Sequence, residues 1–136
     1  MTQANALKSY KTVATQTAAP GNLVLMLYDG ALRFLQRAVE SFQHTDPVEF
    51  NQGVNNNILR AQSIINELNT SLDMDQGGEL ADKLRGLYNY FDERLQEGNI
   101  AKEQQPVDEV IDRLSVIRDA WREMLAQQQP PELAAA

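Results

Sequence analysis

The chain has 136 residues, a length typical of one domain that buries its own core without disulfides or metals. It contains no cysteine, which excludes a disulfide framework, a thiolate metal site and a thiol nucleophile. Lys plus Arg number 12 against 19 for Asp plus Glu, and the net charge of −7 disfavours nucleic acid as the main partner. No signal peptide and no apolar run long enough to span a bilayer are visible, so the sequence predicts a cytosolic protein without membrane insertion.

The N-terminal segment 1–19 is polar, but Leu7, Tyr10 and Val13 recur in it at a spacing of three. One interpretation is a frayed terminus. The other is a flexible or lid segment that docks these apolar side chains onto the rest of the molecule.

The first helix is predicted over about 20–44 and organises the rest of the chain. Pro20 suits a first helical position because its missing N–H would be unpaired there. Two adjoining apolar stripes run along this helix and make its apolar face wider than that of a surface helix. We therefore expect it to be covered on two sides, by neighbouring helices and by a terminal segment or a partner chain.

The second helix is predicted over about 47–72, with Asp46 as its N-cap and Pro47 in the first position. Asparagine, a weak helix former, is frequent in this helix. The asparagines are Asn51, Asn55, Asn56 and Asn57. They form either a solvated face or a polar ladder that hydrogen-bonds a partner.

The third helix is predicted over about 78–97 and the fourth over about 106–128, each with apolar residues three and four apart. Gly98 is placed as the left-handed residue that ends the third helix. Pro130 and Pro131 stop the fourth, and residues 129–136 are expected to form a loose tail.

Four helices joined by short loops predict an all-α fold, an antiparallel up-down-up-down four-helix bundle over 20–128 with the N-terminal segment packing over it. A di-iron site in such a bundle needs two Glu-x-x-His pairs, and His44 is the single histidine. No phosphate-binding glycine loop or catalytic constellation is present. We therefore expect no enzyme activity, no metal and no cofactor.

Short motifs follow one another along the chain. They are LMLYDGA at 25–31, NILRAQSII at 57–65, GGELA at 77–81, LYNY at 87–90 and RDAW at 118–121. In order and spacing, from about Leu7 to Trp121, they resemble the flagellar export chaperone FliS family. Ala19, Asn89 and Gly98 depart from the family pattern.

The resemblance implies a cytosolic chaperone that binds the disordered C-terminal region of flagellin 1:1. Such a chaperone prevents premature polymerisation and delivers its client to the flagellar type III export gate. The resemblance also implies possible contacts with an export gate component, an anti-sigma factor and a flagellar assembly factor. We expect a monomer or weak dimer. The alternative is a self-associating structural or adaptor bundle that does not bind flagellin.

The predicted partner-binding site has two parts. The predicted lid consists of Leu7, Tyr10 and Val13. The predicted groove on the second helix consists of Ile58, Ala61, Gln62 and Ile65. Plain bundle core is the alternative for this helix face, but a buried amide must be hydrogen-bonded, which makes Gln62 harder to explain as core. We expect Asp29 to bond another helix or a loop, and Trp121 to belong to the core.

Overall fold

The computed structural model describes residues 20–128. Residues 1–19 and 129–136 lie outside the described part, and with them the predicted lid and tail. The described chain forms four α-helices: α2 (Pro20–Ser41), α3 (Pro47–Thr70), α4 (Gly78–Ala101) and α5 (Gln105–Gln128). No strand occurs between residues 20 and 128, so the prediction of an all-α four-helix bundle is confirmed.

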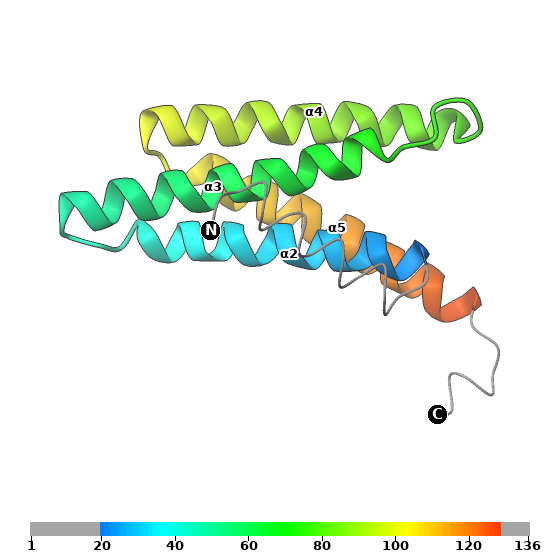
Figure 1. Cartoon of the computed structure of the whole chain (residues 1–136), viewed down its shortest axis with the longest axis horizontal. Helices are drawn as coiled ribbons and strands as arrows, with labels where there is room; N and C mark the ends of the chain where they lie inside the picture. The colour runs from blue at the N-terminus through cyan, green and yellow to red at the C-terminus, as the bar shows by residue number, and fades with distance from the viewer. Residues whose placement is uncertain (1–19, 129–136) are drawn as a thin grey trace.

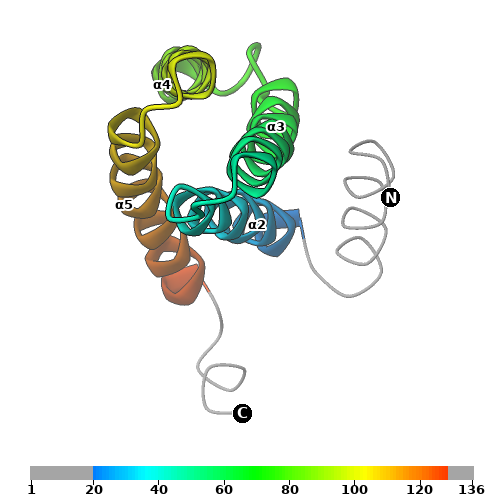
Figure 2. The ribbon, with the colours of Figure 1, turned by 90° about the vertical axis from the view of Figure 1, so that its left-hand side faces the viewer.

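Consecutive helices run antiparallel and follow one another around the bundle (Figure 1). Viewed from the end, α2 lies beside α3 and α5, while α4 lies beside the same two helices on the opposite side (Figure 2). α5 is inclined to α4. The two helices are close where the loop joins them, and they diverge towards the C-terminal end of α5 (Figure 1).

All four helices contribute large buried side chains to one core. Its largest fully buried members are Tyr28, Leu35, Val54, Ile58, Ile65, Leu68, Tyr88, Phe91, Leu95, Val107, Val110 and Leu114. Burying one such side chain contributes about 1.5–3 kcal/mol, so this cluster drives the packing of the helices. Among the described residues, every buried side-chain nitrogen and oxygen has a hydrogen-bond partner.

The start of α3 follows its local sequence. The Asp46 side chain accepts a hydrogen bond of 3.0 Å from the backbone N–H of Glu49, and Pro47 takes the first position. This arrangement satisfies one of the unpaired N–H groups at the helix start. The capping role expected for Asp46 is therefore confirmed.

The end of α4 corrects the expectation for Gly98. The helix continues to Ala101, and Lys102 instead adopts the left-handed conformation, with φ 54°. Lys102 Nζ donates to the carbonyl oxygen and to Oδ1 of Asn99, at 2.8 and 2.6 Å. A Cβ on Gly98 would lie 3.1 Å from the Glu103 carbonyl oxygen and 3.2 Å from Pro106 Cβ. Glycine suits this position because the following loop and the start of α5 pack against the helix there.

Candidate partner-binding site

An apolar groove lies between the first half of α4 and the second half of α5, over a side chain of α2. Its volume is about 320 Å³. The groove is lined by Tyr28, Leu80, Leu84, Val116, Ile117, Ala120, Trp121 and Met124. Leu80 is 63% exposed and Val116 is 70% exposed, although both are large apolar residues. Contiguous exposed apolar surface of this kind is typical of a partner-binding site.

Helical spacing builds both walls of this groove. Leu80 and Leu84 stand one turn apart on α4, and Val116 and Ala120 stand one turn apart on α5. Tyr28 forms the floor and is buried within the bundle.

The second half of α5 is hydrogen-bonded to α2 through two side chains. The Trp121 indole N–H donates to the Gly21 carbonyl oxygen at 2.9 Å, and its ring meets the Tyr28 ring edge-on at 6.5 Å. Arg118 donates to Asp29 at 2.9 Å. Asp29 therefore bonds another helix, as expected. These contacts draw α5 towards α2 and leave its α4-facing side open as the groove.

The other end of the α4–α5 pair is closed by charged side chains. Glu109 on α5 accepts hydrogen bonds from the Tyr90 hydroxyl at 2.6 Å and from Arg94 Nε at 2.9 Å, both on α4. Arg113 Nε lies 3.1 Å from the same carboxylate. The Tyr90 hydrogen bond, followed by the bond from Arg94, holds the pKa of Glu109 below its ordinary value. The carboxylate is thus kept ionised where the two helices are close.

A pair of tyrosines lies beneath the groove. The hydroxyl oxygens of Tyr28 on α2 and Tyr88 on α4 are 2.5 Å apart, joined by a buried hydrogen bond. Burial raises the pKa of both tyrosines, so both hydroxyls are neutral at physiological pH. Each hydroxyl supplies the partner that the other needs away from water.

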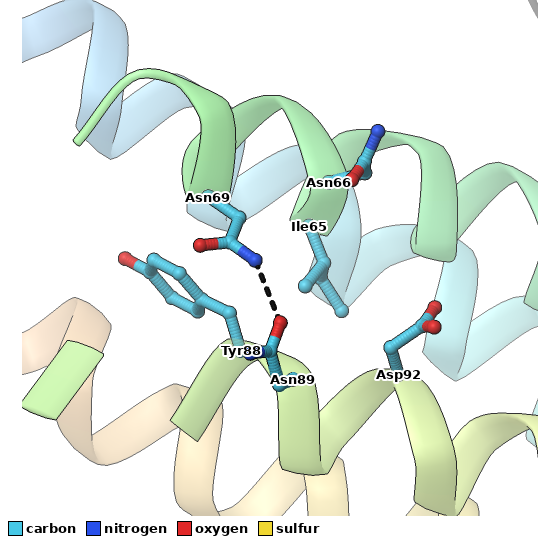
Figure 3. A pocket seen from close by; sticks show the side chains of 6 residues that line it. All are labelled: Ile65, Asn66, Asn69, Tyr88, Asn89 and Asp92. Atoms are coloured by element: carbon cyan, nitrogen blue, oxygen red, sulfur yellow. Dashed lines mark hydrogen bonds between the residues drawn. The ribbon is translucent and has the colours of Figure 1, made fainter. Parts of the chain in front are cut away.

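The outer seam between α3 and α4 is polar. Figure 3 shows Asn69 of α3 donating to Asn89 of α4, at 2.9 Å, beside a small pocket of about 50 Å³. Arg85 Nε also donates to Asn69, at 3.1 Å. This pocket has room for little more than one or two water molecules. It is part of a hydrogen-bonded seam and too small for an organic ligand.

The predicted site residues that the structure describes lie in different environments. Ile58, Ala61 and Ile65 are buried in the core, and none of them lines the apolar groove between α4 and α5. Ile65 borders the small pocket at the seam between α3 and α4 (Figure 3). Gln62 lies partly exposed at the seam between α3 and α4, where its Nε2 donates to Asp92 Oδ1 at 3.1 Å. Leu7, Tyr10 and Val13 lie outside the described residues. Whether any of the seven contacts a partner stays a prediction.

The sequence alone did not predict this groove. Leu80 and Leu84 belong to the apolar stripe of the third predicted helix, and Trp121 was assigned to the core. Trp121 is only partly buried and packs against the core from the groove wall. The signal was present as an apolar stripe, but periodicity does not show which part of a stripe stays uncovered.

Within residues 20–128, no group of three or more His, Asp or Glu side chains could hold a metal ion. In the same part of the chain, no helix combines the length and apolar character needed to cross a bilayer.

The sequence model described as "Flagellar protein FliS" matches residues 3–129 of this chain. The chain belongs to the FliS family. A protein of Bacillus subtilis named flagellar secretion chaperone FliS is 33% identical over 121 residues, which cover 89% of this chain and 86% of the relative. Its namesake in Salmonella typhimurium is 35% identical over 129 residues, covering 91% and 93%. That of Escherichia coli is 36% identical over 113 residues, covering 82% and 80%. The resemblance found in the sequence motifs is thereby confirmed.

Proposed function

We propose that this chain is a cytosolic export chaperone that binds the disordered C-terminal region of flagellin 1:1. Binding prevents premature polymerisation, and the chaperone then delivers its client to the flagellar type III export gate. Contacts with an export gate component, an anti-sigma factor and a flagellar assembly factor belong to the same proposal.

The family match carries this proposal. It spans residues 3–129, and the curated relatives with the same family name are flagellar secretion chaperones. The match covers most of each relative's length, so the comparison concerns the whole fold.

The groove between α4 and α5 supports the proposal by its shape and chemistry. Two apolar walls and an aromatic floor suit one face of an amphipathic helix, whose anchors recur at three- and four-residue spacing. The exposed side chains of Leu80 and Val116 lose contact with water when such a helix docks. This burial of apolar surface makes the main favourable contribution to the binding free energy. We propose this groove as the first docking place of the client.

A disordered client also explains how release stays feasible. A segment that folds on binding loses about 2–5 kcal/mol of the gross interaction energy to its own ordering. The complex can therefore bury a large apolar surface without becoming irreversible.

The seven residues predicted from sequence have a defined place in this proposal. Leu7, Tyr10 and Val13 are proposed to cover apolar surface while no client is bound. Gln62 is accessible from the seam between α3 and α4. Ile58, Ala61 and Ile65 of the predicted second-helix groove are buried in the core, and they would reach a client only if α3 shifts.

Titration calorimetry with a synthetic C-terminal flagellin peptide from the same organism tests the proposal. We expect 1:1 binding with a negative heat-capacity change, because apolar surface is buried. Val116→Asp, at a largely exposed position, should leave the fold intact and weaken binding about tenfold or more, which corresponds to about 1.4 kcal/mol.

Val48→Asp is the matched control. Val48 is 59% exposed and stands in the first turn of α3, away from the groove. Its substitution should leave the affinity unchanged. Absence of binding to the flagellin peptide, together with a stable oligomer of the free chain, would instead favour the self-associating adaptor bundle.

A further inference from the structure

The arginines of the described chain divide into two groups. Those on α4 and α5 each form a hydrogen bond or an ion pair with a neighbouring group. They are Arg85, Arg94, Arg113, Arg118 and Arg122. The three on α2 and α3 have no carboxylate within 4.0 Å among residues 20–128; they are Arg33, Arg37 and Arg60.

Two of these arginines lie against one aromatic ring, and the third stands one helical turn away. The guanidinium carbons of Arg37 on α2 and Arg60 on α3 lie 5.5 and 5.8 Å from the centre of the Phe34 ring. Arg33 stands one helical turn before Arg37, and the exposed Asn56 stands one turn before Arg60. We call Arg33, Phe34, Arg37, Asn56 and Arg60 the arginine patch.

Stacking prepares the patch for an anion. A guanidinium over an aromatic face keeps its N–H groups free at the edge, while the ring restricts the long side chain. Two or three like charges held close together also repel one another unless an anion lies between them. The fork of an arginine matches a carboxylate in two parallel hydrogen bonds.

We propose that the arginine patch docks an acidic segment of a partner protein. Carboxylates one helical turn apart on that segment pair with Arg37 and Arg60, and an apolar side chain of the segment packs on the Phe34 ring. Arg33 and the Asn56 amide extend the contact along the two helices.

The surroundings favour a short protein segment over a long polyanion. The whole chain carries a net charge of −7, and Glu40 stands one turn beyond Arg37 on α2. An extended nucleic acid backbone or an anionic membrane would also meet the rest of this negatively charged molecule. A short acidic segment fits on the three arginines and avoids most of that negative charge.

The patch is separate from the groove. It lies on α2 and α3, whereas the groove opens between α4 and α5. Figure 2 shows these two pairs of helices on opposite sides of the bundle. A client in the groove and an acidic partner on the patch can therefore be bound at the same time. The inference does not depend on what the groove binds.

Fluorescence anisotropy with the full chain tests it. The probe is a labelled synthetic helical peptide with glutamates one turn apart and a central leucine, alongside a copy with glutamine for glutamate. We expect the glutamate peptide alone to bind, more weakly as salt rises. Arg33→Gln/Arg37→Gln/Arg60→Gln should lower its affinity about tenfold or more, and the corresponding triple lysine variant should lose part of it because lysine lacks the fork.

The matched control is Lys83→Gln/Arg113→Gln/Arg122→Gln, which removes the same charge from exposed positions of α4 and α5. Because Arg113 and Arg122 form ion pairs, circular dichroism and thermal unfolding must first show that this variant folds as the wild type does. It should retain the affinity for the glutamate peptide. Equal losses in the two triple variants, or equal binding of the glutamine peptide, would overturn the proposal. So would patch-dependent binding of anionic vesicles or single-stranded DNA without binding of the peptide.

Discussion

The two helical hairpins of this bundle are held together in different ways. α2 and α3 make the most extensive helix–helix contact of the bundle, and both carry fully buried small residues, Ala31 and Ala38 on α2 and Ala61 on α3. At Gly53 the approach is so close that an added Cβ would lie 2.7 Å from Ser41 Cβ. α4 and α5 instead meet through larger polar side chains around Glu109 at one end and diverge at the other.

The difference shows where surface remains available. Small residues let two helices approach until little apolar surface remains between them. In the second hairpin, the contacts of Arg118 and Trp121 with α2 draw one end of α5 away from α4. The molecule thus has a closely packed hairpin that supplies most of the core and a diverging hairpin that carries an open groove.

Gly53→Ala is expected to have the largest effect, because it breaks the close packing of α2 and α3. The new Cβ would meet both Cβ and Oγ of Ser41, so the helices must separate. We expect the free energy of unfolding to fall by about 2–3 kcal/mol in urea titrations followed by circular dichroism. Ser41→Gly/Gly53→Ala should be more stable than Gly53→Ala alone, and failure of this rescue would contradict the steric explanation.

Tyr28→Phe tests the bond that joins the two hairpins across the core. It removes one hydroxyl of the buried pair and leaves Tyr88 without its partner. We expect a loss of about 1–2 kcal/mol in the same unfolding experiment. Tyr28→Phe/Tyr88→Phe should cost less than the sum of the two single changes. Additive effects would mean that the two hydroxyls do not depend on each other.

Glu109→Gln tests the charged closure between α4 and α5, and we expect a smaller effect. The folded-state pKa of Glu109 lies below the ordinary value of 4.5, so its contribution is fully present above about pH 4.5. That contribution is lost as the pH falls through the lowered folded pKa. Wild type should be the more stable protein at neutral pH, and the difference should shrink in acid. Glu123→Gln, at an exposed position on the same helix, should not show this pH dependence; a constant difference for Glu109→Gln would argue against the network.

Gly86→Ala is expected to have the smallest effect, of opposite sign to Gly53→Ala. Gly86 is exposed in the middle of α4, and an added Cβ would meet nothing within 4 Å. Alanine is the better helix former, so we expect a gain of about 0.5–1 kcal/mol in the free energy of unfolding. A decrease in the free energy of unfolding would show that the outer face of α4 is packed against another group. The second hairpin would then be more closely packed than the structure indicates.

Local sequence was sufficient to predict the helices and most of their starts. The roles of Asp46 and Pro47 depend only on residues in the same helical turn, so they could be assigned before the fold was known. Gly98 was misassigned as a helix end. A glycine is needed there because Pro106 of the next helix packs against this position, and local sequence does not reveal that contact. Glycine next to asparagine fits a helix end equally well on local grounds.

The groove depends on contacts that are distant in sequence. Asp29 and Arg118 are 89 residues apart, and their ion pair helps to incline α5. Periodicity placed Ile58 and Ile65 on the apolar side of their helix, but it cannot say which other helix covers that side. The asparagines of α3 also include both local and distant contacts. Asn51 and Asn57 donate to carbonyl oxygens of their own helix, whereas Asn55 accepts a hydrogen bond from Asn99 on α4.

The single tryptophan of the chain lines the groove, and this has a practical consequence. The indole of Trp121 is partly exposed at the wall while its N–H is held by Gly21. Its emission spectrum therefore reports the polarity of the groove itself, without any label. A ligand that enters should shift the emission to the blue and protect the indole from acrylamide quenching. Occupation of the arginine patch, on the other side of the bundle, should leave both signals unchanged.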